Sequence, residues 1–263
     1  MKYVLVTGAG GGMGKSAVKL LSDAGYKVFA LDLRGVDGIG GIVPIEADIT
    51  SQESLERAVE LVREYTDELY AIVHFAGIYM LDSLVEISDD SFRKIFDVNL
   101  RGAYLINKTF LPFLRNGSRI LITTSELAPL DPLPFTGIYA ISKSALDRYA
   151  YSLRMELQLL GIGVSVLRAG AVNTDMLGVS TDALDRFCEG TKLYSCNSER
   201  FRKIVNGVEA KNIKADKLAE KCAAILKNRR PRFSYSINRN PLLLLLNVLP
   251  SKLQFFIIRK ILS

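Results

Sequence analysis

LVTGAGGGMGKSAVKL, residues 5–20, joins a short apolar run to a helical pattern through a turn that holds five glycines. Two kinds of phosphate-binding loop have this composition. A nucleoside-triphosphate loop, G-x-x-x-x-G-K-[ST], needs glycine where Ala9 stands, and the dinucleotide pattern G-x-G-x-x-G needs glycine where Met13 stands. The pattern that does fit is T-G-x-x-x-G-x-G, carried by Thr7, Gly8, Gly12 and Gly14.

Each glycine of this pattern has a physical role in a dinucleotide turn. Gly8 allows a tight exit from the strand, Gly12 lets the backbone approach a pyrophosphate, and Gly14 lets the following helix pack on the sheet. The helix N-terminus then offers free N–H groups and the positive end of its dipole to the anion. The alternative is a strand-to-helix turn that binds nothing, and the rest of the chain has to decide between the two.

The composition is that of a soluble α/β protein with one domain. The chain has 263 residues, of which 49% are hydrophobic and 24% charged, and this length suffices for a full core without a second domain. Because no run of about 18 uninterrupted apolar residues exists, no transmembrane helix is expected. We see no signal-peptide pattern and expect a cytoplasmic protein, with membrane association as a further option.

Metal chemistry and nucleic-acid binding are not expected. Cys188, Cys196 and Cys222 lack the spacing of a metal site, and His74 is the single histidine. His74 would also have to be the base of any Ser-His-Asp triad, which disfavours that chemistry. The net charge is +6, but the basic residues form no groove-sized patch with interleaved aromatic residues.

Short apolar runs alternate with helical patterns along the chain. Helices are predicted over 15–25 and 51–69, the second with a Ser51 cap. Alternation of this kind favours a Rossmann-type, doubly wound parallel sheet with helices on both faces, and we expect one domain over 1–263. The polar stretch 175–213 follows the end of a strand and is interpreted as a substrate lid. The predicted buried strands are YVLVTG (3–8), KVFALD (27–32), AIVHFAG (71–77), RILITTS (119–125) and GVSVLRAG (163–170).

Asp32, at the end of the second predicted strand, indicates which dinucleotide binds. A carboxylate at this position accepts hydrogen bonds from a ribose 2′-hydroxyl and repels a 2′-phosphate, so NAD is preferred and NADP remains possible. Arg34, two residues later, argues mildly for NADP. A solvated loop aspartate without a ligand is the alternative.

Tyr139 and Lys143 form a candidate proton-transfer pair. Their i, i+4 spacing places both side chains on one face of a helix. A nearby cation favours the phenolate and is expected to lower the pKa of Tyr139 from its reference value of about 10. The pair could then exchange a proton with an alcohol or carbonyl oxygen. A surface helix face is the alternative.

Ser125 and Asn99 are candidates for the same site. Ser125 ends a predicted strand, where its hydroxyl would point into the crevice and hold a substrate oxygen. Asn99 lies within an apparent helix, where asparagine has no propensity advantage. A strand-end cap and a buried hydrogen bond are the respective structural alternatives.

Taken together, these motifs resemble the compact, single-domain branch of the short-chain dehydrogenase/reductase family over nearly the whole chain. The resemblance rests on TGAGGGMG (7–14), Asp48 in ADIT, FAG (75–77), VNLRG around Asn99, Ser125, YAISK (139–143) and AGAVNT (169–174). It implies an enzyme with a catalytic tetrad of Asn99, Ser125, Tyr139 and Lys143. Tyr139 would be the acid/base, Ser125 would orient the substrate oxygen, Lys143 would hold the nicotinamide ribose, and Asn99 would hold a relay water. The implied cofactor contacts are Thr7, Gly8, Gly12, Met13, Gly14, Asp32, Asp48, Ile49, Ala76, Gly77, Tyr139, Lys143, Val172 and Thr174.

Three features depart from the family pattern. His74 stands where the family usually has asparagine, and a structural hydrogen bond is the preferred interpretation of this residue. Ala169 replaces the usual proline before Gly170. The interval from Ser125 to Tyr139 is one residue longer than usual, so Thr124 and Glu126 are weighed as alternatives, and Ser125 is chosen.

The C-terminal segment 240–263 is apolar and split by two prolines into pieces too short to span a bilayer. Its helical spacing of apolar residues, with Lys252, Arg259 and Lys260 nearby, predicts an amphipathic segment on a membrane surface. A tail that covers the active site or lies in a subunit interface is the alternative. The tail, the lid and LPF before Tyr139 look like the retinol and hydroxysteroid dehydrogenases of the family, which implies a small lipophilic alcohol or ketone as substrate.

Two other functions remain open at this stage. One is a related epimerase or dehydratase that keeps NAD bound, and the other is a non-catalytic, membrane-associated scaffold or sensor that binds NAD. The complete tetrad disfavours the scaffold. The resemblance further implies a homodimer or homotetramer.

Overall fold

The computed structural model describes residues 1–36, 40–208 and 212–263, with only the backbone of 175–180 and 207–208. Its centre is a seven-stranded sheet in the order β3-β2-β1-β4-β5-β6-β9, and every neighbouring pair is parallel. The predicted doubly wound parallel sheet is confirmed. The strands are β1 (Tyr3–Thr7), β2 (Lys27–Asp32), β3 (Ile42–Glu46), β4 (Leu69–His74), β5 (Leu114–Ser125), β6 (Gly163–Ala169) and β9 (Ser234–Ile237); β7 (Val172–Asn173) and β8 (Ile213–Lys214) form a second, small sheet.

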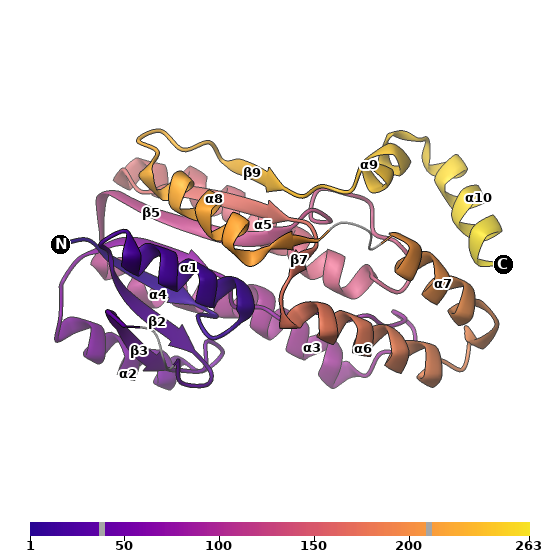
Figure 1. Ribbon diagram of the computed structural model, residues 1–263, viewed down its shortest axis with the longest axis horizontal. Coiled ribbons are helices and arrows are strands. Elements are labelled where there is room, and N and C mark those ends of the chain that lie inside the picture. The colour runs from indigo at the N-terminus through magenta and orange to yellow at the C-terminus, as the bar shows by residue number, and fades with distance from the viewer. Residues whose placement is uncertain (37–39, 209–211) are drawn as a thin grey trace.

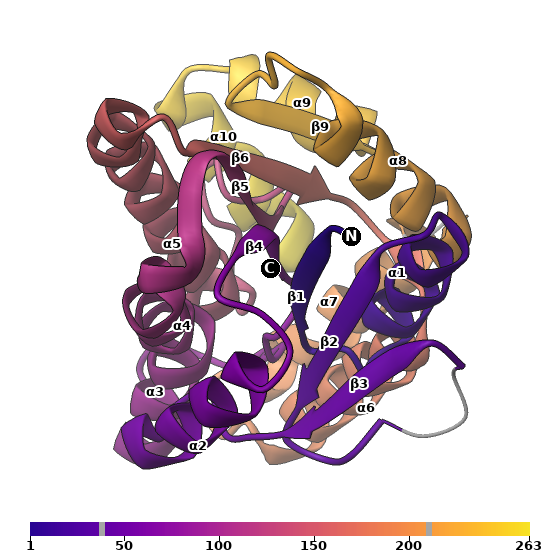
Figure 2. The ribbon, with the colours of Figure 1, turned by 90° about the vertical axis from the view of Figure 1, so that its left-hand side faces the viewer.

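Two layers of helices cover the sheet, as Figure 2 shows. On one face, α2 (Gln52–Arg63), α4 (Ala103–Phe110) and α5 (Gly137–Leu157) pack on one apolar core. On the other face, α1 (Gly12–Asp23) and α8 (Ala215–Lys227) pack on a second core. Both faces are buried, which is why the central strands are almost continuously apolar rather than alternating.

The remaining helices lie mostly beyond the carboxyl ends of the strands, at the right of Figure 1. There α6 (Asp175–Gly190) and α7 (Ser195–Val208) bury a third apolar cluster against Leu81 and Phe135. The C-terminal segment forms α9 (Pro241–Val248) and α10 (Ser251–Leu262), and α10 packs on α7. The other elements are α3 (Asp89–Phe96), the π-helical turn η1 (Asp97–Gly102), and the short turns η2 (Leu111–Phe113) and η3 (Gln158–Leu160).

Most predicted elements are confirmed, with shifted boundaries. The helix predicted over 15–25 begins at Gly12, and the one predicted over 51–69 ends at Arg63, with Ser51 as its cap. The predicted lid 175–213 contains α6 and α7, and its residues 209–211 lie outside the described part of the chain. Strands β3 and β9 were not among the predicted strands.

None of the helices built from the described residues combines the length and the apolar character that crossing a membrane requires. The C-terminal segment forms two separate helices of 8 and 12 residues.

Candidate active site

The glycine-rich turn has the shape that the sequence predicts. Gly8 has a φ of +67°, and a Cβ there would overlap the backbone of Ala76 at the end of β4. A Cβ on Gly14 would overlap the carbonyl of Gly8, so α1 approaches the turn more closely than any side chain allows. The residue before α1 is Gly11, which has no side chain to cap the helix. No side chain therefore caps the first-turn N–H groups, which is the arrangement that an anion site needs.

Asp32 is held beside this turn at the end of β2. Its carboxylate accepts hydrogen bonds from the backbone N–H of Gly10, at 2.8 Å, and of Arg34, at 3.3 Å. These two bonds fix the direction of the carboxylate next to the glycine turn. A carboxylate in this position suits the ribose hydroxyls of a dinucleotide.

Other predicted cofactor contacts surround the same turn. Thr174, after β7, lies so close to Gly12 that a Cβ on Gly12 would be 2.7 Å from the Cβ of Thr174. Asp48 accepts hydrogen bonds from the N–H and the hydroxyl of Thr50, at 2.8 and 2.7 Å. Ile49 packs against Gly102 of η1. Val172 is buried and Met13 packs partly on the same core. These residues, with Thr7 and Gly77, lie near the carboxyl edge of the sheet, and their contacts with a dinucleotide remain a prediction.

Ser125, Tyr139 and Lys143 converge at that edge. Ser125 is the last residue of β5, and hydrogen bonding between its hydroxyl and Tyr139 acts to lower the pKa of the phenol. Lys143 lies one turn along α5, with its Nζ 5.8 Å from the centroid of the Tyr139 ring. The neighbours of Ser125 face elsewhere, since the Thr124 hydroxyl donates to Asp147 and Glu126 accepts from the N–H of Asn240. The choice of Ser125 among the three thus agrees with the geometry.

The pKa of Tyr139 does not shift in the predicted direction. Burial, and then the nearby hydroxyl of Tyr79, raise the pKa of Tyr139. Burial also lowers the pKa of Lys143 to about 8. The expected lowering of the pKa of Tyr139 is therefore wrong, because desolvation by burial is the largest effect on that pKa and raises it. At neutral pH Tyr139 is a protonated phenol, the form that donates a proton to a carbonyl oxygen.

Asn99 holds the backbone beside Lys143. Its Oδ1 accepts from the N–H of Ile78 at 2.8 Å, and its Nδ2 donates to the carbonyl of Ile78 and to the Ser142 hydroxyl, both at 3.0 Å. A Cβ on Gly77 would be 3.1 Å from both Asn99 Oδ1 and Lys143 Nζ. Asn99 belongs to the π-helical turn η1, a type of irregularity that frequently occurs at functional sites.

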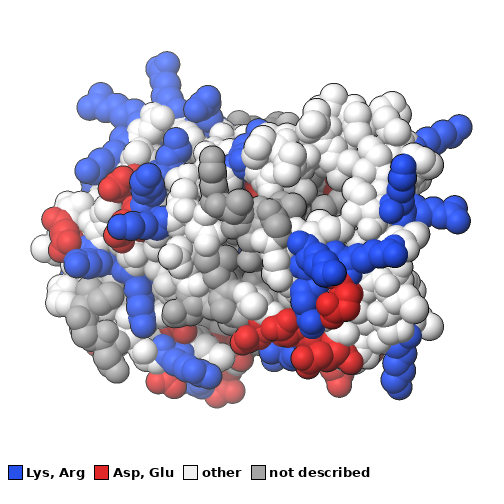
Figure 3. All heavy atoms as spheres, turned by 45° about the vertical axis from the view of Figure 1, so that its right-hand side comes forward, with Lys and Arg blue, Asp and Glu red and all other residues white. Residues whose placement is uncertain are grey.

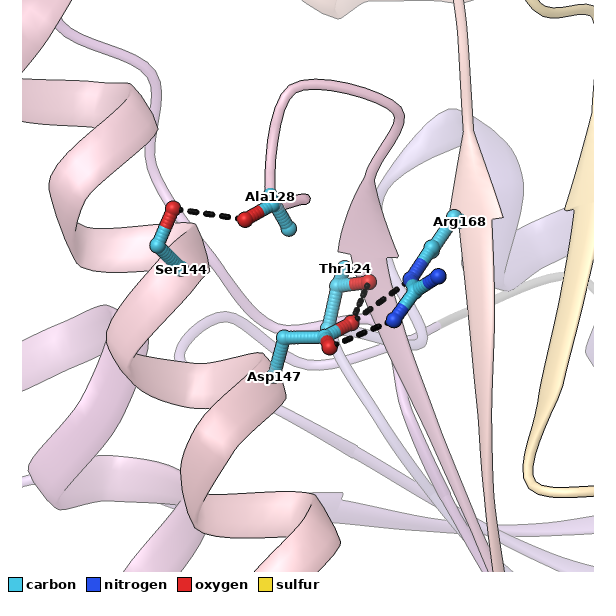
Figure 4. A network of polar contacts seen from close by, with 5 residues as sticks. All are labelled: Thr124, Ala128, Ser144, Asp147 and Arg168. Atoms are coloured by element: carbon cyan, nitrogen blue, oxygen red, sulfur yellow. Dashed lines mark hydrogen bonds and ion pairs between the residues drawn. The ribbon is translucent and has the colours of Figure 1, made fainter. Parts of the chain in front are cut away.

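A partly buried ion pair anchors the helix that carries Tyr139 and Lys143. The guanidinium of Arg168 on β6 donates to both carboxylate oxygens of Asp147 on α5, at 2.9 and 2.7 Å (Figure 4). Thr124 donates to the same carboxylate, and the Ser144 hydroxyl donates to the carbonyl of Ala128 at 2.8 Å. Bidentate pairs of this kind fix orientation as well as distance. They hold α5 against β5 and β6 next to the catalytic groups.

His74 has the structural role that the sequence analysis preferred. Its Nε2 lies 2.9 Å from Asn107 Oδ1 in the interior, and Asn107 in turn donates to the hydroxyl of Tyr149. Burial lowers the pKa of His74 to about 4, so the imidazole is neutral at physiological pH. It lies beneath the crevice and not in it.

This burial predicts a loss of stability in mild acid. The unfolded chain binds a proton at a pKa of about 6.5 and the folded chain only at about 4, so unfolding is favoured as the pH falls between these values. We expect the His74 contribution to fall by about 2 kcal/mol from pH 7 to pH 5. Urea unfolding of the wild type and of His74→Gln at both pH values measures it. An equal loss in the two proteins would contradict the role of His74.

A cleft of about 440 Å³ lies next to this site, although Tyr139 is not one of its lining residues. Tyr79 lines it, and its ring contacts that of Tyr139, with centroids 4.8 Å apart. Leu81 and Phe187 give the cleft an apolar wall, and Glu86 anchors its rim by accepting from the Thr191 hydroxyl at 2.6 Å. The cleft is bounded by the segment after β4 and by α6, so the predicted lid forms one of its walls.

Comparison with known proteins identifies the family. A model of the family described as short chain dehydrogenase matches residues 2–185. The chain belongs to the short-chain dehydrogenase family. It is 29% identical over 248 residues to 3-amino-tetrahydro-pyrrolizinone reductase of Xenorhabdus hominickii, covering 90% of this chain and 86% of that protein. It is 32% identical over 197 residues to estradiol 17-beta-dehydrogenase 2 of Mus musculus, covering 70% of this chain and 51% of that protein.

Solved structures show the same fold. The 3-ketoacyl-(acyl-carrier-protein) reductase of Brucella melitensis, solved as a complex with NADH, superposes with a TM-score of 0.74 at 22% identity over 90% of this chain and 96% of that chain. Levodione reductase superposes with a TM-score of 0.74 at 20% identity over 90% of this chain and 95% of that chain. The short-chain dehydrogenases use NAD or NADP to interconvert alcohol and carbonyl groups, and this chain is an oxidoreductase of that family.

Three residues of the site were missed by the sequence analysis. Tyr79 packs on Tyr139 from the segment after β4, a contact that no local pattern signals. The Ser142 hydroxyl accepts a hydrogen bond from Asn99 and donates one to the backbone carbonyl of Tyr139, at 2.8 Å. Asp147 could have been found from the sequence, because it lies one helical turn beyond Lys143 and two beyond Tyr139, on the same helix face.

Proposed function

We propose that this protein is an NAD-dependent dehydrogenase/reductase that interconverts a secondary alcohol and a ketone on a small lipophilic molecule. The observation that carries the proposal is the convergence of Ser125, Tyr139 and Lys143 at the sheet edge next to the glycine-rich turn. Bound nicotinamide would supply or accept the hydride. The turn and Asp32 have the shape and charge that hold such a dinucleotide.

Each residue of the tetrad has a role that its geometry allows. Tyr139 donates its phenolic proton to a carbonyl oxygen, or takes the proton of a hydroxyl in the reverse direction. The Ser125 hydroxyl, hydrogen-bonded to Tyr139, steadies the same oxygen as charge develops on it. Lys143 places a cation one helical turn away, and Asn99 positions the backbone of Ile78 beside it.

The contacts of Asp32 support NAD over NADP. Two backbone N–H groups hold its carboxylate beside the turn. The carboxylate is therefore pre-organised for the ribose hydroxyls and cannot easily move away to make room for a 2′-phosphate. Arg34 is exposed and lies two residues further on. A 2′-phosphate beside this carboxylate would meet a like charge in a partly buried place.

Removing this carboxylate is expected to change the choice of cofactor. In Asp32→Ala, the ratio of kcat/KM with NADPH to kcat/KM with NADH should rise by about tenfold or more, since a like-charge repulsion of 1.4 kcal/mol or above is removed. Steady-state kinetics with both cofactors measures the ratio. Asp131→Ala, far from the turn, is the control, and an unchanged ratio in Asp32→Ala would overturn the preference for NAD.

The substrate class is supported by the cleft and by the names of several relatives. Leu81, Phe187 and the ring of Tyr79 offer apolar contacts to a molecule in the cleft. The lining also contains Asp82, Glu86 and Arg186, so such a molecule would carry polar groups as well. Relatives include estradiol 17-beta-dehydrogenase 2 and a 3-ketodihydrosphingosine reductase of Bacteroides thetaiotaomicron, whose names refer to lipophilic substrates.

The experiment is an absorbance assay at the reduced-nicotinamide band. The purified protein is offered steroid, retinoid and long-chain ketones, and small polar ketones for comparison, with NADH and separately with NADPH. Faster turnover of the apolar set with NADH supports the proposal. Tight NAD binding without turnover of any carbonyl or alcohol would favour a non-catalytic sensor instead.

A further inference from the structure

Helices α9 and α10 leave an unusually large part of their apolar surface exposed. The only buried residue of α10, which the structure describes in full, is the polar Gln254, and α9 has no buried residue. Some apolar side chains of the two helices are half-buried against the domain, and the others face outward. Those most exposed are Leu242 (60%), Leu245 (64%), Val248 (81%), Phe255 (71%) and Phe256 (61%), with Leu253 and Ile261 also exposed.

Two uncharged polar side chains of this segment, Asn247 and Gln254, face the domain and fasten the segment to it. Asn247 accepts from the N–H of Asp131 at 2.7 Å, and Gln254 donates to the carboxylate of Asp131 at 3.4 Å. Asn197 on α7 donates to the carbonyl of Leu262 at 2.7 Å. The outward position of the leucines and phenylalanines is therefore set by specific hydrogen bonds to the domain.

The charge of this end of the chain is uniformly positive. Nine lysines and arginines and no aspartate or glutamate follow Glu220, although the whole chain carries a net charge of only +6. Lys252, Arg259 and Lys260 on α10 are all exposed. Figure 3 shows a broad uncharged surface at its upper right, where α9 and α10 lie in Figure 1, with Lys and Arg side chains projecting at its edge.

We propose that the outward faces of α9 and α10 are a docking surface for a bilayer that contains anionic lipids. Side chains such as those of Phe255 and Phe256 enter the boundary between headgroups and acyl chains, while the lysines and arginines remain at the level of the headgroup phosphates. A helix that lies in this boundary combines exposed apolar residues with cations in this way. Each cation near an anionic surface adds to the attraction.

A second copy of this chain fits the surface less well than a bilayer. Two copies joined by a twofold axis would bring the same patch together, so the cations of one α10 would face those of the other. No acidic residue of segment 239–263 offers them a partner. An anionic lipid surface supplies both the apolar volume and the countercharge.

The surface also lies close to the substrate cleft. Leu262 of α10 packs on the apolar cluster that includes Phe187, and Phe187 lines the cleft beside Tyr79. If the proposed function holds, a lipophilic substrate could pass from the bilayer to Tyr139 along this side of the protein. Docking itself does not depend on that function, and it can be measured without cofactor or substrate.

The test is sedimentation of the full-length protein with vesicles. One set is made of phosphatidylcholine alone and another contains about 30% phosphatidylserine. We expect binding to the anionic set that weakens with added salt, and a fall in the partition coefficient by about tenfold or more in Phe255→Ser/Phe256→Ser. The matched control is Leu159→Ser/Leu160→Ser, which removes two side chains of similar exposure (83% and 58%) from η3, and it should bind like the wild type.

Two results would overturn the proposal. One is absence of binding to anionic vesicles at low salt, or equal binding by both double variants, with circular dichroism showing that both are folded. The other is a dimer, seen by analytical ultracentrifugation without lipid, that Phe255→Ser/Phe256→Ser dissociates, because the surface would then be an interface between copies. In either case the absorbance assay with soluble ketones still tests the dehydrogenase activity separately.

Discussion

Tyr139→Phe is expected to lower kcat by about 10³-fold and to leave the affinity for NADH nearly unchanged. The substitution removes one oxygen and keeps the ring, including its contact with Tyr79 at 4.8 Å. Without the phenol, no group remains at this position to donate a proton to the carbonyl oxygen or to remove one from the hydroxyl. Loss of a general acid–base group of this kind costs about 10² to 10⁴ in rate.

The measurement separates proton transfer from binding. Steady-state kinetics gives kcat, and titration of NADH fluorescence gives the dissociation constant of the cofactor. Tyr149→Phe is a matched control on the same helix, because the Tyr149 hydroxyl bonds to Asn107, away from the crevice. We expect turnover like that of the wild type in this control. Turnover within tenfold of the wild type in Tyr139→Phe would remove the acid/base role from Tyr139.

The pH profile of the reduction follows from the directions of the two pKa shifts. Tyr139, with a raised pKa, stays protonated through neutral pH, whereas Lys143 loses its charge around a pKa of about 8. In alcohol oxidation, the oxidised nicotinamide ring would add a positive charge that favours the phenolate form of Tyr139. As the pH rises, the kcat of ketone reduction at saturating cofactor should therefore decline around pH 8, where Lys143 loses its charge, before Tyr139 is deprotonated.

The features that the sequence predicted well are local. The turn from Thr7 to Gly14 is specified by residues within one strand and one helix, so the local sequence is enough to explain why each glycine is needed. Ser125 at the end of β5 and the pair of Tyr139 and Lys143 on α5 follow from strand ends and helical spacing. The parallel order of the strands follows from the alternation of apolar runs with helices.

The features that it did not predict depend on distant contacts. The short edge strand β9 contains Tyr235 and is only four residues long, and its pairing with β6 is needed to recognise it. The ion pair of Asp147 with Arg168 joins residues that are 21 positions apart. The predicted direction of the pKa shift of Tyr139 was wrong, because helical spacing gives the distance to a cation and says nothing about the loss of solvent around the phenol.

The outward apolar faces of α9 and α10 illustrate the same limit. Helical spacing identified an amphipathic tail, but it could not tell whether the apolar side faces the domain or the surroundings. The hydrogen bonds of Asn247 and Gln254 to Asp131 decide that question, because they turn these two side chains toward the domain. The orientation of an amphipathic helix is thus a property of its tertiary contacts, even when its periodicity is plain.

Asn99→Ala is expected to affect both stability and turnover, since Asn99 satisfies the N–H and the carbonyl of Ile78 at once. Losing both partners of a partly buried backbone segment should lower the free energy of unfolding by about 2 kcal/mol. The segment that carries Gly77 would also shift next to Lys143 Nζ. Displacing a positioning segment by about 1 Å costs on the order of 10² in rate, so kcat should fall by that factor.

Ser142→Ala is the matched comparison, because it removes only the hydroxyl that accepts from Asn99 and leaves both bonds to Ile78 in place. We expect a loss of about 1 kcal/mol and a much smaller change in kcat. Urea unfolding and steady-state kinetics of both variants separate the two effects of Asn99. If Asn99→Ala lost stability like Ser142→Ala while its kcat still fell about 10²-fold, the residue would act on the reacting groups directly, through a bound water, and not by holding the backbone of Ile78.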